Sequence, residues 1–391
     1  MKKYLIIGNG VAVTTAAEYI RKNDPSGEIT IVTEEGLPFY YRIRLPDFLC
    51  GEVEESGLIA KKKEWYQENN ITLRLSIIIT GGSLENKFLL SSSGEKIRFD
   101  RLILANGSTP NIPAITGSDK KGVFALHCIQ DAKDIINHAS SCKKAILIGG
   151  GLLGLEAGNG LKQLGLEVTV VEFFPRLLPR QLDGEGGHRL QNILEDQGFS
   201  FKLDAITRTI EGNDEVEGVT LENGEFIAAD IVVISAGVNP KMDIAMQLGL
   251  DCNRGIKVDK QMRTSHPDIY AAGDTVEFEG RTYGIWPAAL EQGKIAGTNI
   301  SGGEANYEGT VLSSILKVAD IDLASAGNID EENQYDSKVV SSETIYKKVV
   351  FDNSKVIGCI MLGDRKNFNR INRAISTGED ILSELDSLLA I

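Results

Sequence analysis

Two short glycine-rich turns, each directly after a run of apolar residues, constrain the fold of this 391-residue chain more than any other feature. The first turn follows Tyr4–Ile7 and reads Gly8-Asn9-Gly10-Val11-Ala12-Val13. The second follows Ala145–Ile148 and reads Gly149-Gly150-Gly151-Leu152-Leu153-Gly154. Each apolar run is typical of a buried parallel strand, and each turn leads into a segment compatible with a helix. The pattern predicts two strand–turn–helix units.

Such a turn lets backbone N–H groups at a helix N-terminus approach a pyrophosphate closely. One turn of this kind also occurs in ordinary strand–helix connections, but two in the same context, each with an acid downstream, indicate two dinucleotide sites. A chain that holds two dinucleotides is expected to pass electrons between them. The residues that we expect to bind a cofactor in the two turns are Gly8, Asn9, Gly10, Val11 and Ala12, and Gly149, Gly151, Leu152, Leu153 and Gly154.

A carboxylate follows the next predicted strand after each turn. The strand Glu167–Val171 ends at Glu172, about 20 residues past the second set of glycines. An acid at this position hydrogen-bonds a ribose 2′-OH and repels a 2′-phosphate, which favours NAD over NADP. After the first turn, the strand Glu28–Val32 leads to Glu34 and Glu35. We expect Glu34, with Glu35 close behind, to bind the ribose of the first dinucleotide.

Composition narrows the class of protein. The length allows two or three domains with ample buried core. No run of about 18 uncharged apolar residues occurs, and no signal-peptide pattern precedes the first strand, so a cytoplasmic location is expected. A net charge of −14 argues against nucleic acid or an anionic membrane as the main partner.

The cysteines and histidines offer no metal site. The five cysteines are scattered, without the spacing of a zinc site, an iron–sulfur cluster or a vicinal redox disulfide. The four histidines are also scattered. We therefore predict no metal, and we expect each cysteine to be a structural residue.

These patterns predict an α/β fold with two Rossmann-like dinucleotide-binding domains, the second inserted in the first, and a small C-terminal α+β domain. The expected boundaries are 1–107 with 236–304 for the first domain, 108–235 for the second and 305–391 for the third. Strands are expected near 71–79, 86–91, 101–105, 216–221 and 230–235, and the C-terminal region contains two β-rich runs and two helical segments. Ile79, at the end of one strand, is a further candidate cofactor contact.

The ordered motifs resemble the FAD-dependent pyridine nucleotide-disulfide oxidoreductases of the glutathione-reductase type over nearly the whole chain. They are the first turn, Leu104–Pro110, Gly149–Glu156, Gly237–Pro240 and Tyr270–Asp274. The resemblance implies that 1–107 with 236–304 binds FAD tightly and non-covalently and that 108–235 binds NADH as a substrate. It places Asp274 at the ribityl–phosphate region of the flavin. Further cofactor contacts implied by it are Ala105, Asn106, Gly107, Gly237 and Gly273.

Two stretches are similar more specifically to NADH:rubredoxin oxidoreductases and to the flavin module of assimilatory nitrite reductases. They are Tyr40–Pro46 and Val171–Asp183. The first contains Arg42 and Arg44, whose guanidinium groups suit a pyrophosphate. The chain also departs from the family. Val13 replaces the third glycine, Asn106 replaces the usual Thr, and Asp47 aligns with a lysine that related reductases place near the flavin.

The redox centres that the family uses beyond flavin are not recognisable here. No cysteine pair lies on the helix after the first turn, no histidine follows His266, and Cys50 lies several residues too late to match the single-cysteine enzymes. Glu156 matches the acid that the family places beside the nicotinamide, and it is the catalytic candidate. Trp286 lies in the stretch that resembles the segment meeting the flavin ring, and it is a cofactor-binding candidate.

The sequence thus predicts a flavoenzyme that passes electrons from NADH through FAD to rubredoxin or a similar small carrier. Three alternatives stay open: an NADH oxidase that reduces dioxygen, an electron-transfer flavoprotein of the ferredoxin- or nitrite-reductase type, and a non-enzymatic FAD-binding redox sensor. Because rubredoxins are generally acidic, docking requires a local basic patch. We expect that patch among Lys355, Arg365, Lys366, Arg370 and Arg373, extended by Lys317, with Lys61–Lys63 as the next candidate.

Overall fold

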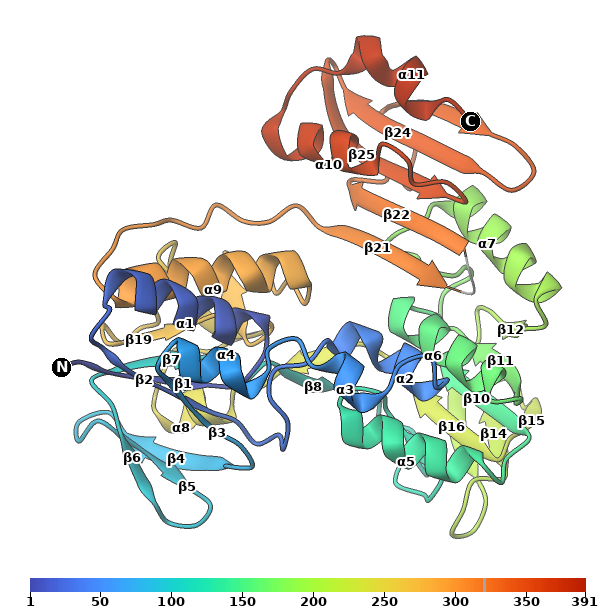
Figure 1. Ribbon diagram of the computed structural model, residues 1–391. Helices are drawn as coiled ribbons and strands as arrows, with labels where there is room; N and C mark the ends of the chain where they lie inside the picture. The colour runs from blue at the N-terminus through green and yellow to red at the C-terminus, as the bar shows by residue number, and fades with distance from the viewer. Residues whose placement is uncertain (319–320) are drawn as a thin grey trace. The chain divides into compact units, whose positions relative to one another are not determined.

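The structure, a computed structural model, describes residues 1–318 and 321–391, without the side chains of residues 316–320. It divides into two compact units, which we describe separately (Figure 1). The first unit comprises Met1–Tyr41, Glu55–Thr109 and Val238–Thr310. The second comprises Arg42–Glu54, Pro110–Gly237 and Val311–Ile391.

The first unit is built on a five-stranded parallel sheet with the strand order β19-β7-β1-β2-β3. Its strands are β1 (Lys3–Ile7), β2 (Glu28–Val32), β3 (Ile71–Arg74), β7 (Arg101–Leu104) and β19 (Ile269–Ala271). The strand that the sequence predicts over 71–79 is interrupted, because Ser76 has a left-handed φ of 57°. The chain then begins a separate antiparallel sheet of β4 (Ile79–Ser83), β5 (Phe88–Ser91) and β6 (Lys96–Arg98).

Two helices pack unusually closely on the first sheet. They are α1 (Val11–Asn23) and α9 (Trp286–Ile300), which run side by side in Figure 1. A Cβ atom at Gly293 would lie 2.4 Å from the carbonyl oxygen of Ala12, and one at Gly297 would lie 2.4 Å from that of Ala16. Only glycine permits this approach. The pair therefore fixes the position of α1 against α9.

Shorter elements complete the first unit. They are α3 (Glu55–Leu58), α4 (Lys63–Glu68), β8 (Ser108–Pro110) paired with β17 (Val238–Pro240), α8 (Asp243–Gln247), and β18 (Ile256–Val258) paired with β20 (Val276–Phe278).

The second unit contains a sheet that repeats the first in outline. Its strand order is β12-β11-β10-β16-β9, and all of its pairings are parallel. In both sheets the strand before a glycine turn is central, between the strand that ends in an acid and a later strand. The strands are β9 (Val123–Phe124), β10 (Lys144–Ile148), β11 (Glu167–Val171), β12 (Ser200–Lys202) and β16 (Ile231–Ile234). This repetition confirms the predicted pair of Rossmann-like sheets.

Helices and a second layer surround that sheet. The helices are α2 (Leu45–Leu49), after a 3₁₀ turn at Arg42–Arg44, then α5 (Ile129–Ala139), α6 (Leu152–Gln163) and α7 (Gly184–Asp196). The layer is an antiparallel sheet of β13 (Thr207–Glu211), β14 (Gly218–Leu221) and β15 (Phe226–Ala228). None of the helices among the described residues has the length and apolar character needed to cross a membrane.

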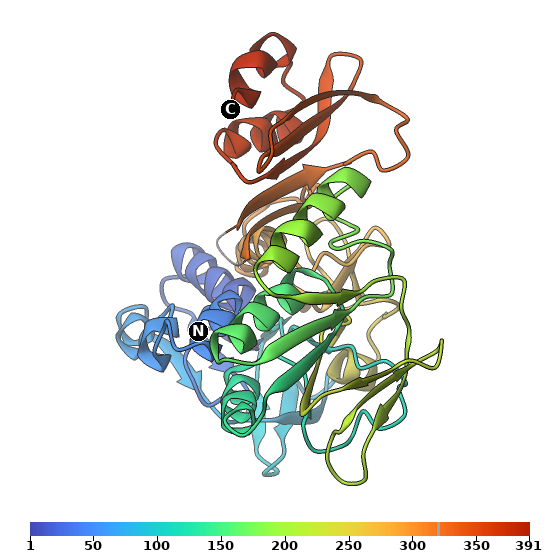
Figure 2. The same cartoon turned by 90° about the vertical axis from the view of Figure 1, so that its right-hand side faces the viewer.

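The C-terminal part of the second unit is an antiparallel sheet with helices on one face (Figure 2). The strand order is β21-β22-β25-β24-β23. Its elements are β21 (Ser313–Val318), β22 (Ile321–Gly327), β23 (Asp336–Ser341), β24 (Tyr346–Asp352), β25 (Lys355–Leu362), α10 (Phe368–Thr377) and α11 (Leu385–Leu389). The sequence pattern indicated β24, β25 and the two helices. It did not indicate the other three strands.

The second face of this sheet packs against the segment between β11 and α7. Leu177, Leu178 and Leu182 are fully buried there in one cluster with Leu323 and Ile360. The conspicuous leucines of the Val171–Asp183 motif therefore form the surface on which the C-terminal sheet rests.

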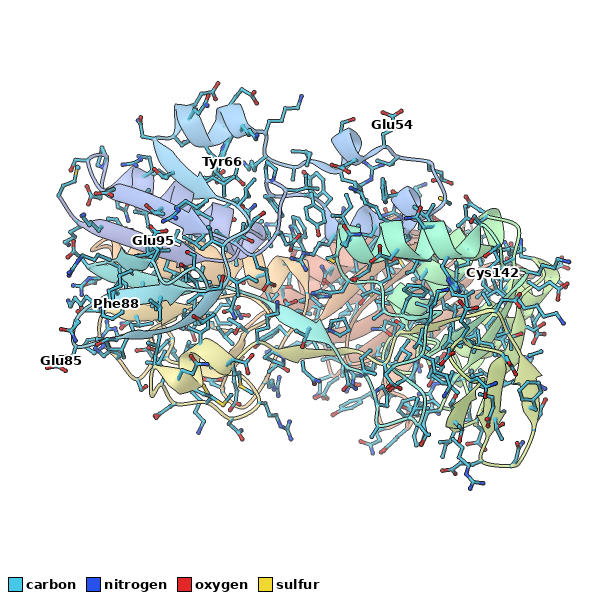
Figure 3. All side chains as sticks on the ribbon, turned by 90° about the horizontal axis from the view of Figure 1, so that it is seen from below. Glu54, Tyr66, Glu85, Phe88, Glu95 and Cys142 are labelled. Carbon is cyan, nitrogen blue, oxygen red and sulfur yellow. The ribbon has the colours of Figure 1, made fainter. Side chains whose placement is uncertain are left out.

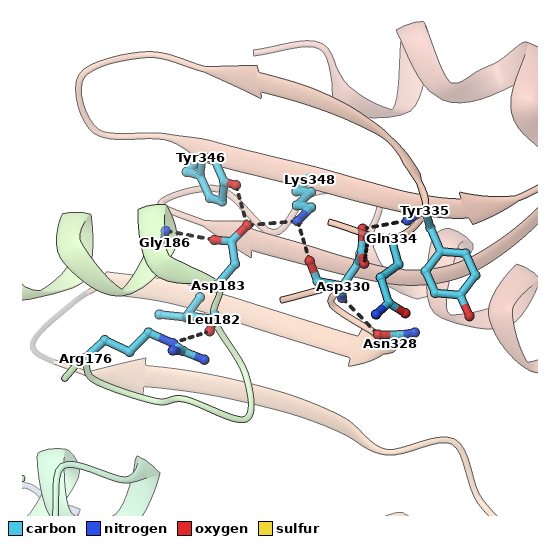
Figure 4. Close-up of polar contacts among 10 residues, drawn as sticks. All are labelled: Arg176, Leu182, Asp183, Gly186, Asn328, Asp330, Gln334, Tyr335, Tyr346 and Lys348. Carbon is cyan, nitrogen blue, oxygen red and sulfur yellow. Dashed lines mark hydrogen bonds and ion pairs between the residues drawn. The ribbon is translucent and has the colours of Figure 1, made fainter. Parts of the chain in front are cut away.

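A buried polar network reinforces this contact (Figure 4). Asp183 caps α7 by accepting a hydrogen bond from the Gly186 N–H at 3.0 Å. Its other carboxylate oxygen accepts hydrogen bonds from the Tyr346 hydroxyl at 2.8 Å and from Lys348 Nζ at 3.1 Å, and Lys348 is only 3% exposed. One carboxylate thus caps α7 and neutralises a buried lysine of β24.

The contact between α1 and α9 gives a stability prediction. We expect Gly293→Ala to lower the free energy of unfolding by about 1–3 kcal/mol, because the added methyl overlaps the Ala12 backbone. Gly184→Ala, on α7, is the matched control, since a Cβ there meets no atom within 4 Å. Thermal and urea unfolding of the two variants measure the difference. Equal stability of the two would contradict the described packing.

Candidate functional site

The two glycine turns share one backbone geometry. Gly8 has a φ of 111° and Gly149 a φ of 113°, a region that only glycine adopts without strain. A Cβ atom at Gly8 would lie 2.2 Å from the carbonyl oxygen of Ala105, and one at Gly149 would lie 2.3 Å from that of Ser235. Each turn is therefore pressed against the end of the adjacent strand, where a side chain has no room.

The third residue of each turn faces open space instead. A Cβ atom at Gly10 or at Gly151 would meet no protein atom within 4 Å. These two glycines are the N-caps of α1 and α6, and they offer no side-chain acceptor to the first N–H groups of the helix. An uncapped helix N-terminus beside free space fits the pyrophosphate of a dinucleotide.

The later positions of the turns differ. A Cβ atom at Gly154 would lie 2.3 Å from the Gly149 carbonyl oxygen, so glycine is required there. At the equivalent place in the first turn, the Val13 side chain is fully buried. Of the candidates that follow the N-caps, Ala12 is buried and Leu153 is 49% exposed, while Val11 and Leu152 are half-buried.

Polar side chains order the loops around the first turn. Asn9 donates to the Leu37 carbonyl at 3.2 Å and accepts a hydrogen bond from the Tyr66 hydroxyl at 2.9 Å. Tyr66, labelled in Figure 3, comes from α4. Asn106 donates to the Lys241 carbonyl at 3.2 Å, while its buried Oδ1 accepts no hydrogen bond from the described residues. That unpaired acceptor, beside the turn, also suits a ligand with hydrogen-bond donors.

Asp274 and Gly273 lie at the end of β19, in the same unit. Asp274 accepts a hydrogen bond from the Ser108 hydroxyl at 3.2 Å. The Gly273 N–H donates to Gln292 Oε1 of α9 at 2.8 Å. The carboxyl ends of parallel strands meet at one edge of a sheet, and the structure brings these residues to the edge that carries the first turn.

Aromatic rings stack at the N-terminus of α9. The Trp286 ring centroid lies 5.6 Å from that of Phe39 and 5.7 Å from that of Tyr41, with interplanar angles of 27° in both pairs. Trp286 was a candidate from sequence. Phe39 was not a candidate, and Tyr41 entered only as part of the Tyr40–Pro46 stretch, because both residues meet Trp286 from a distant part of the chain.

The remaining candidates of the first unit are distributed around this edge. Glu34 is exposed and ion-paired with Lys241, whereas Glu35 is half-buried. Gly107 has a positive φ of 73° after the buried Ala105. Ile79 is buried at the start of β4 rather than at the end of a strand.

Glu172 is fixed in the second unit by two backbone hydrogen bonds. Its side chain is 6% exposed and accepts hydrogen bonds from the Gly150 N–H at 2.5 Å and the Phe174 N–H at 2.9 Å. The predicted ribose ligand therefore also holds the glycine turn in shape. Gly237 is the last residue of the segment Pro110–Gly237 of this unit. It has a φ of 91°, and its carbonyl accepts a hydrogen bond from the Asn111 N–H.

Arg42 and Arg44 belong to the second unit. Arg42 Nη1 lies 3.0 Å from His127 Nε2, and Arg44 Nε donates to Asp47 at 3.0 Å. Both arginines therefore contact side chains of their own unit, and α2, which follows them, packs on α5 and α6. Their role toward a pyrophosphate stays a prediction.

Glu156 lies half-buried on α6. Burial, with a further contribution from the negative charge of Asp47, raises the pKa of Glu156 to about 8. The carboxyl group is therefore mainly neutral at pH 7. A group with such a pKa is a hydrogen-bond donor at neutral pH, and perturbed acids of this kind are typical of functional sites.

Comparison with known proteins identifies the family. Residues 2–293 match the model of the pyridine nucleotide-disulphide oxidoreductases, and residues 313–379 match the rubredoxin NAD⁺ reductase C-terminal domain. The chain belongs to the pyridine nucleotide-disulphide oxidoreductase family.

Individual relatives agree with this assignment. The chain is 38% identical to the nitrite reductase [NAD(P)H] of Bacillus subtilis, over 97% of this chain and 48% of that protein. It is 33% identical to the NADH-rubredoxin oxidoreductase of Clostridium acetobutylicum, over 99% and 98% of the two chains. The crystal structure of NADH:rubredoxin oxidoreductase from Clostridium acetobutylicum is similar with a TM-score of 0.82 and 31% identity, and the match covers 99% of both chains. The chain spans about half the length of this nitrite reductase and of the assimilatory nitrate reductase electron transfer subunit of Bacillus subtilis, to which it is 35% identical.

The position of Glu172 predicts the choice of nucleotide. We expect NADH to be preferred over NADPH, because the carboxylate repels a 2′-phosphate. Glu172→Gln should narrow the ratio of kcat/KM values by about tenfold, since the amide is uncharged and its oxygen still accepts one of the two backbone hydrogen bonds. Glu172→Ala should lose activity with both nucleotides, because two backbone N–H groups lose their acceptor. Glu167→Gln, at the exposed start of β11, is the control. Equal use of both nucleotides by the unmodified protein would contradict the assignment.

The raised pKa of Glu156 predicts a pH-dependent stability. The folded chain keeps this proton up to about pH 8, whereas an unfolded carboxyl releases it near 4.5. The free energy of unfolding should therefore fall between these pH values, by about 5 kcal/mol. Glu156→Gln should match the unmodified protein at pH 4 and exceed its stability at pH 9, as measured by urea unfolding. The exposed Glu222→Gln should show no such difference at either pH. A constant difference between the Glu156 variant and the unmodified protein across this range would show that the carboxyl is not perturbed.

Proposed function

We propose that this chain is an FAD-containing, NADH-oxidising reductase that delivers electrons to rubredoxin or a similar small carrier in the cytoplasm. The pair of equivalent glycine turns supports the proposal most directly. Each combines an uncapped helix N-terminus with open space at the third position, as a bound pyrophosphate requires. The first unit would hold FAD, and the nucleotide sheet of the second would hold NADH.

Bound FAD would supply the ability to take a hydride from NADH and to release electrons one at a time. The residues of the chain would bind and orient. Gly8–Ala12 would face the FAD pyrophosphate, and Asp274 and Asn106 would hydrogen-bond the same cofactor. Glu172 would hold the NADH ribose. Glu156, neutral at pH 7, would lie on the helix whose N-terminus faces the NADH pyrophosphate.

A thiol-based mechanism is opposed by the state of the cysteines. Burial raises the pKa of all five thiols, to about 12 for Cys359, so the thiolate form is disfavoured at each. Among the described residues no disulfide joins any of them. Cys50 also donates to the Asp47 carbonyl at 3.2 Å. These contacts favour a flavin that works without a redox-active disulfide.

The identity of the electron acceptor is the more specific part of the proposal. Rubredoxin is supported by the match of residues 313–379 to the C-terminal domain of rubredoxin reductases and by the Clostridium acetobutylicum relative. A second candidate is electron supply to a nitrite-reducing centre, which the higher identity to the Bacillus subtilis protein favours. Reduction of dioxygen is a third outcome of the same test.

The local excess of positive charge expected at residues 355–373 is smaller in the structure than the sequence predicts. Arg365 is ion-paired with Asp322, and Arg370 with both Glu379 and Glu384. Lys355 is the first residue of the eight-residue β25, and Arg365 lies beyond the last, so about 23 Å of strand separates the two. The side chain of Lys317 lies outside the described residues. Neutralisation and separation therefore leave little of the predicted excess charge in one place.

An anaerobic titration tests the proposed function. Equimolar NADH should bleach the flavin of the purified protein, and two equivalents of oxidised rubredoxin, a one-electron acceptor, should restore its colour. Excess NADH with excess rubredoxin should then give many turnovers, whereas dioxygen should restore the colour slowly. Cys50→Ser should leave the rate of rubredoxin reduction nearly unchanged, because the thiol takes no part. A flavin that NADH does not reduce would point to the sensor, and rapid oxidation by dioxygen to the oxidase. A loss of several orders of magnitude in Cys50→Ser would revive a thiol mechanism.

A further inference from the structure

Lysines from three separate segments meet on one surface of the first unit. Lys22 lies near the end of α1, Lys294 on α9, and Lys61, Lys62 and Lys63 at and before the start of α4. Lys22, Lys62, Lys63 and Lys294 are exposed, and Lys61 is half-buried. We call these five residues the lysine face.

Side-chain contacts join three of the five lysines, Lys22, Lys294 and Lys61, to α1. The Lys22 and Lys294 ammonium groups lie 4.5 Å and 5.6 Å from the centroid of the same Tyr19 ring. Glu18 precedes Tyr19 on α1, about one helical turn from Lys22, and it accepts a hydrogen bond from Lys61 Nζ at 2.8 Å. Lys61 also lies 4.5 Å from the centroid of the Trp65 ring. Tyr19 and Trp65 thus hold the ammonium groups in place through cation–π contacts.

The charge balance of the lysine face is opposite to that of the chain. Against five lysines, α1 and residues 61–68 contribute the acids Glu18, Glu64 and Glu68, and Glu18 is occupied by Lys61. On α9, Glu291 is half-buried and accepts a hydrogen bond from Thr310. A net excess of positive charge therefore persists here in a chain of net charge −14. Two lysines that share one aromatic ring repel each other, and an approaching carboxylate relieves that repulsion.

We propose that the lysine face is the docking surface for an acidic electron-carrier protein. This inference rests on the proposed function, since a carrier is needed only if electrons leave the flavin. The lysine face lies on α1 and α9, the helices whose N-termini carry Gly10 and Trp286, two candidate FAD contacts. Lys294 is eight residues, or about 12 Å, along α9 from Trp286. A carrier bound there lies over the helices that frame the expected cofactor.

Charge complementarity selects the partner. A local basic surface steers an acidic protein even when both partners carry net negative charge, because the field near the interface governs encounter. An extended polyanion such as a membrane of anionic lipid is disfavoured, since it meets the rest of the acidic surface as well. The occupant that fits is a compact protein with a cluster of carboxylates.

The test compares two double charge reversals in the full holoenzyme. Lys22→Glu with Lys294→Glu reverses the lysine face, and Lys366→Glu with Arg373→Glu makes the same change in charge on exposed residues of the C-terminal part. We expect the first variant to raise the KM for rubredoxin at least about tenfold at 20 mM salt and the control to change it little. The effect should shrink at 0.5 M salt, because screening shortens the Debye length to only a few Å. Flavin content and the rate of flavin reduction by NADH should stay unchanged in both.

Calorimetric binding of oxidised rubredoxin without NADH separates the two proposals. Turnover by the unmodified protein with equal KM values in both variants overturns the docking surface and leaves the function standing. If the unmodified protein binds rubredoxin without turnover, and only the Lys22/Lys294 variant loses that binding, the docking surface is supported and the proposed reductase function is contradicted. If the unmodified protein shows neither turnover nor binding of rubredoxin, both proposals are contradicted. Sedimentation with vesicles of phosphatidylserine, abolished by the Lys22/Lys294 change, would assign the lysine face to a membrane and overturn the carrier proposal.

Discussion

A main-chain contact too close for any side chain determines where the helix after each glycine turn begins. The Gly8 and Gly149 α-carbons approach the carbonyl groups of Ala105 and Ser235 so closely that a Cβ would overlap them. This contact places Gly10 and Gly151 at the N-terminus of a helix with open space before it. The order of the strands, the uncapped helix ends and the location of the polar residues all depend on it, because they are arranged around the edge that it creates.

Those turns were predictable because their information is local. Glycine spacing, the preceding apolar run and the acid at Glu172 lie within one short stretch of sequence. The features that sequence reasoning missed connect distant residues. Gly293 and Gly297 matter only because Ala12 and Ala16 lie opposite, and Arg370 is neutral in effect only because Glu379 and Glu384 lie beside it. The interruption at Ser76 was missed since a positive φ at a serine has no sequence signal.

The segment from Glu172 to Asp183 has two functions at its two ends. Glu172 accepts the Gly150 N–H of the glycine turn, while Asp183 binds Lys348 and Tyr346 of the C-terminal sheet. A buried lysine is unfavourable alone, and removal of its partner typically costs about 3–5 kcal/mol. The buried pair therefore contributes less to net stability than to fixing one arrangement of the sheet on α7. The Val171–Asp183 motif therefore has a structural role at Asp183, beside the cofactor-binding role that is predicted for Glu172.

The neutral form of Glu156 at pH 7 has two causes, of which burial is the larger. The second is the negative charge of Asp47, at a position where the family resemblance leads one to expect a lysine. Arg44 pairs with Asp47 and so leaves Glu156 without a cationic partner from that residue. At neutral pH α6 consequently presents a protonated carboxyl near its N-terminus, which adds no negative charge against an anionic dinucleotide. Aspartate in place of a lysine lowers the local charge by two units. The proton retained by Glu156 offsets one of them, and the ion pair of Arg44 with Asp47 offsets the other.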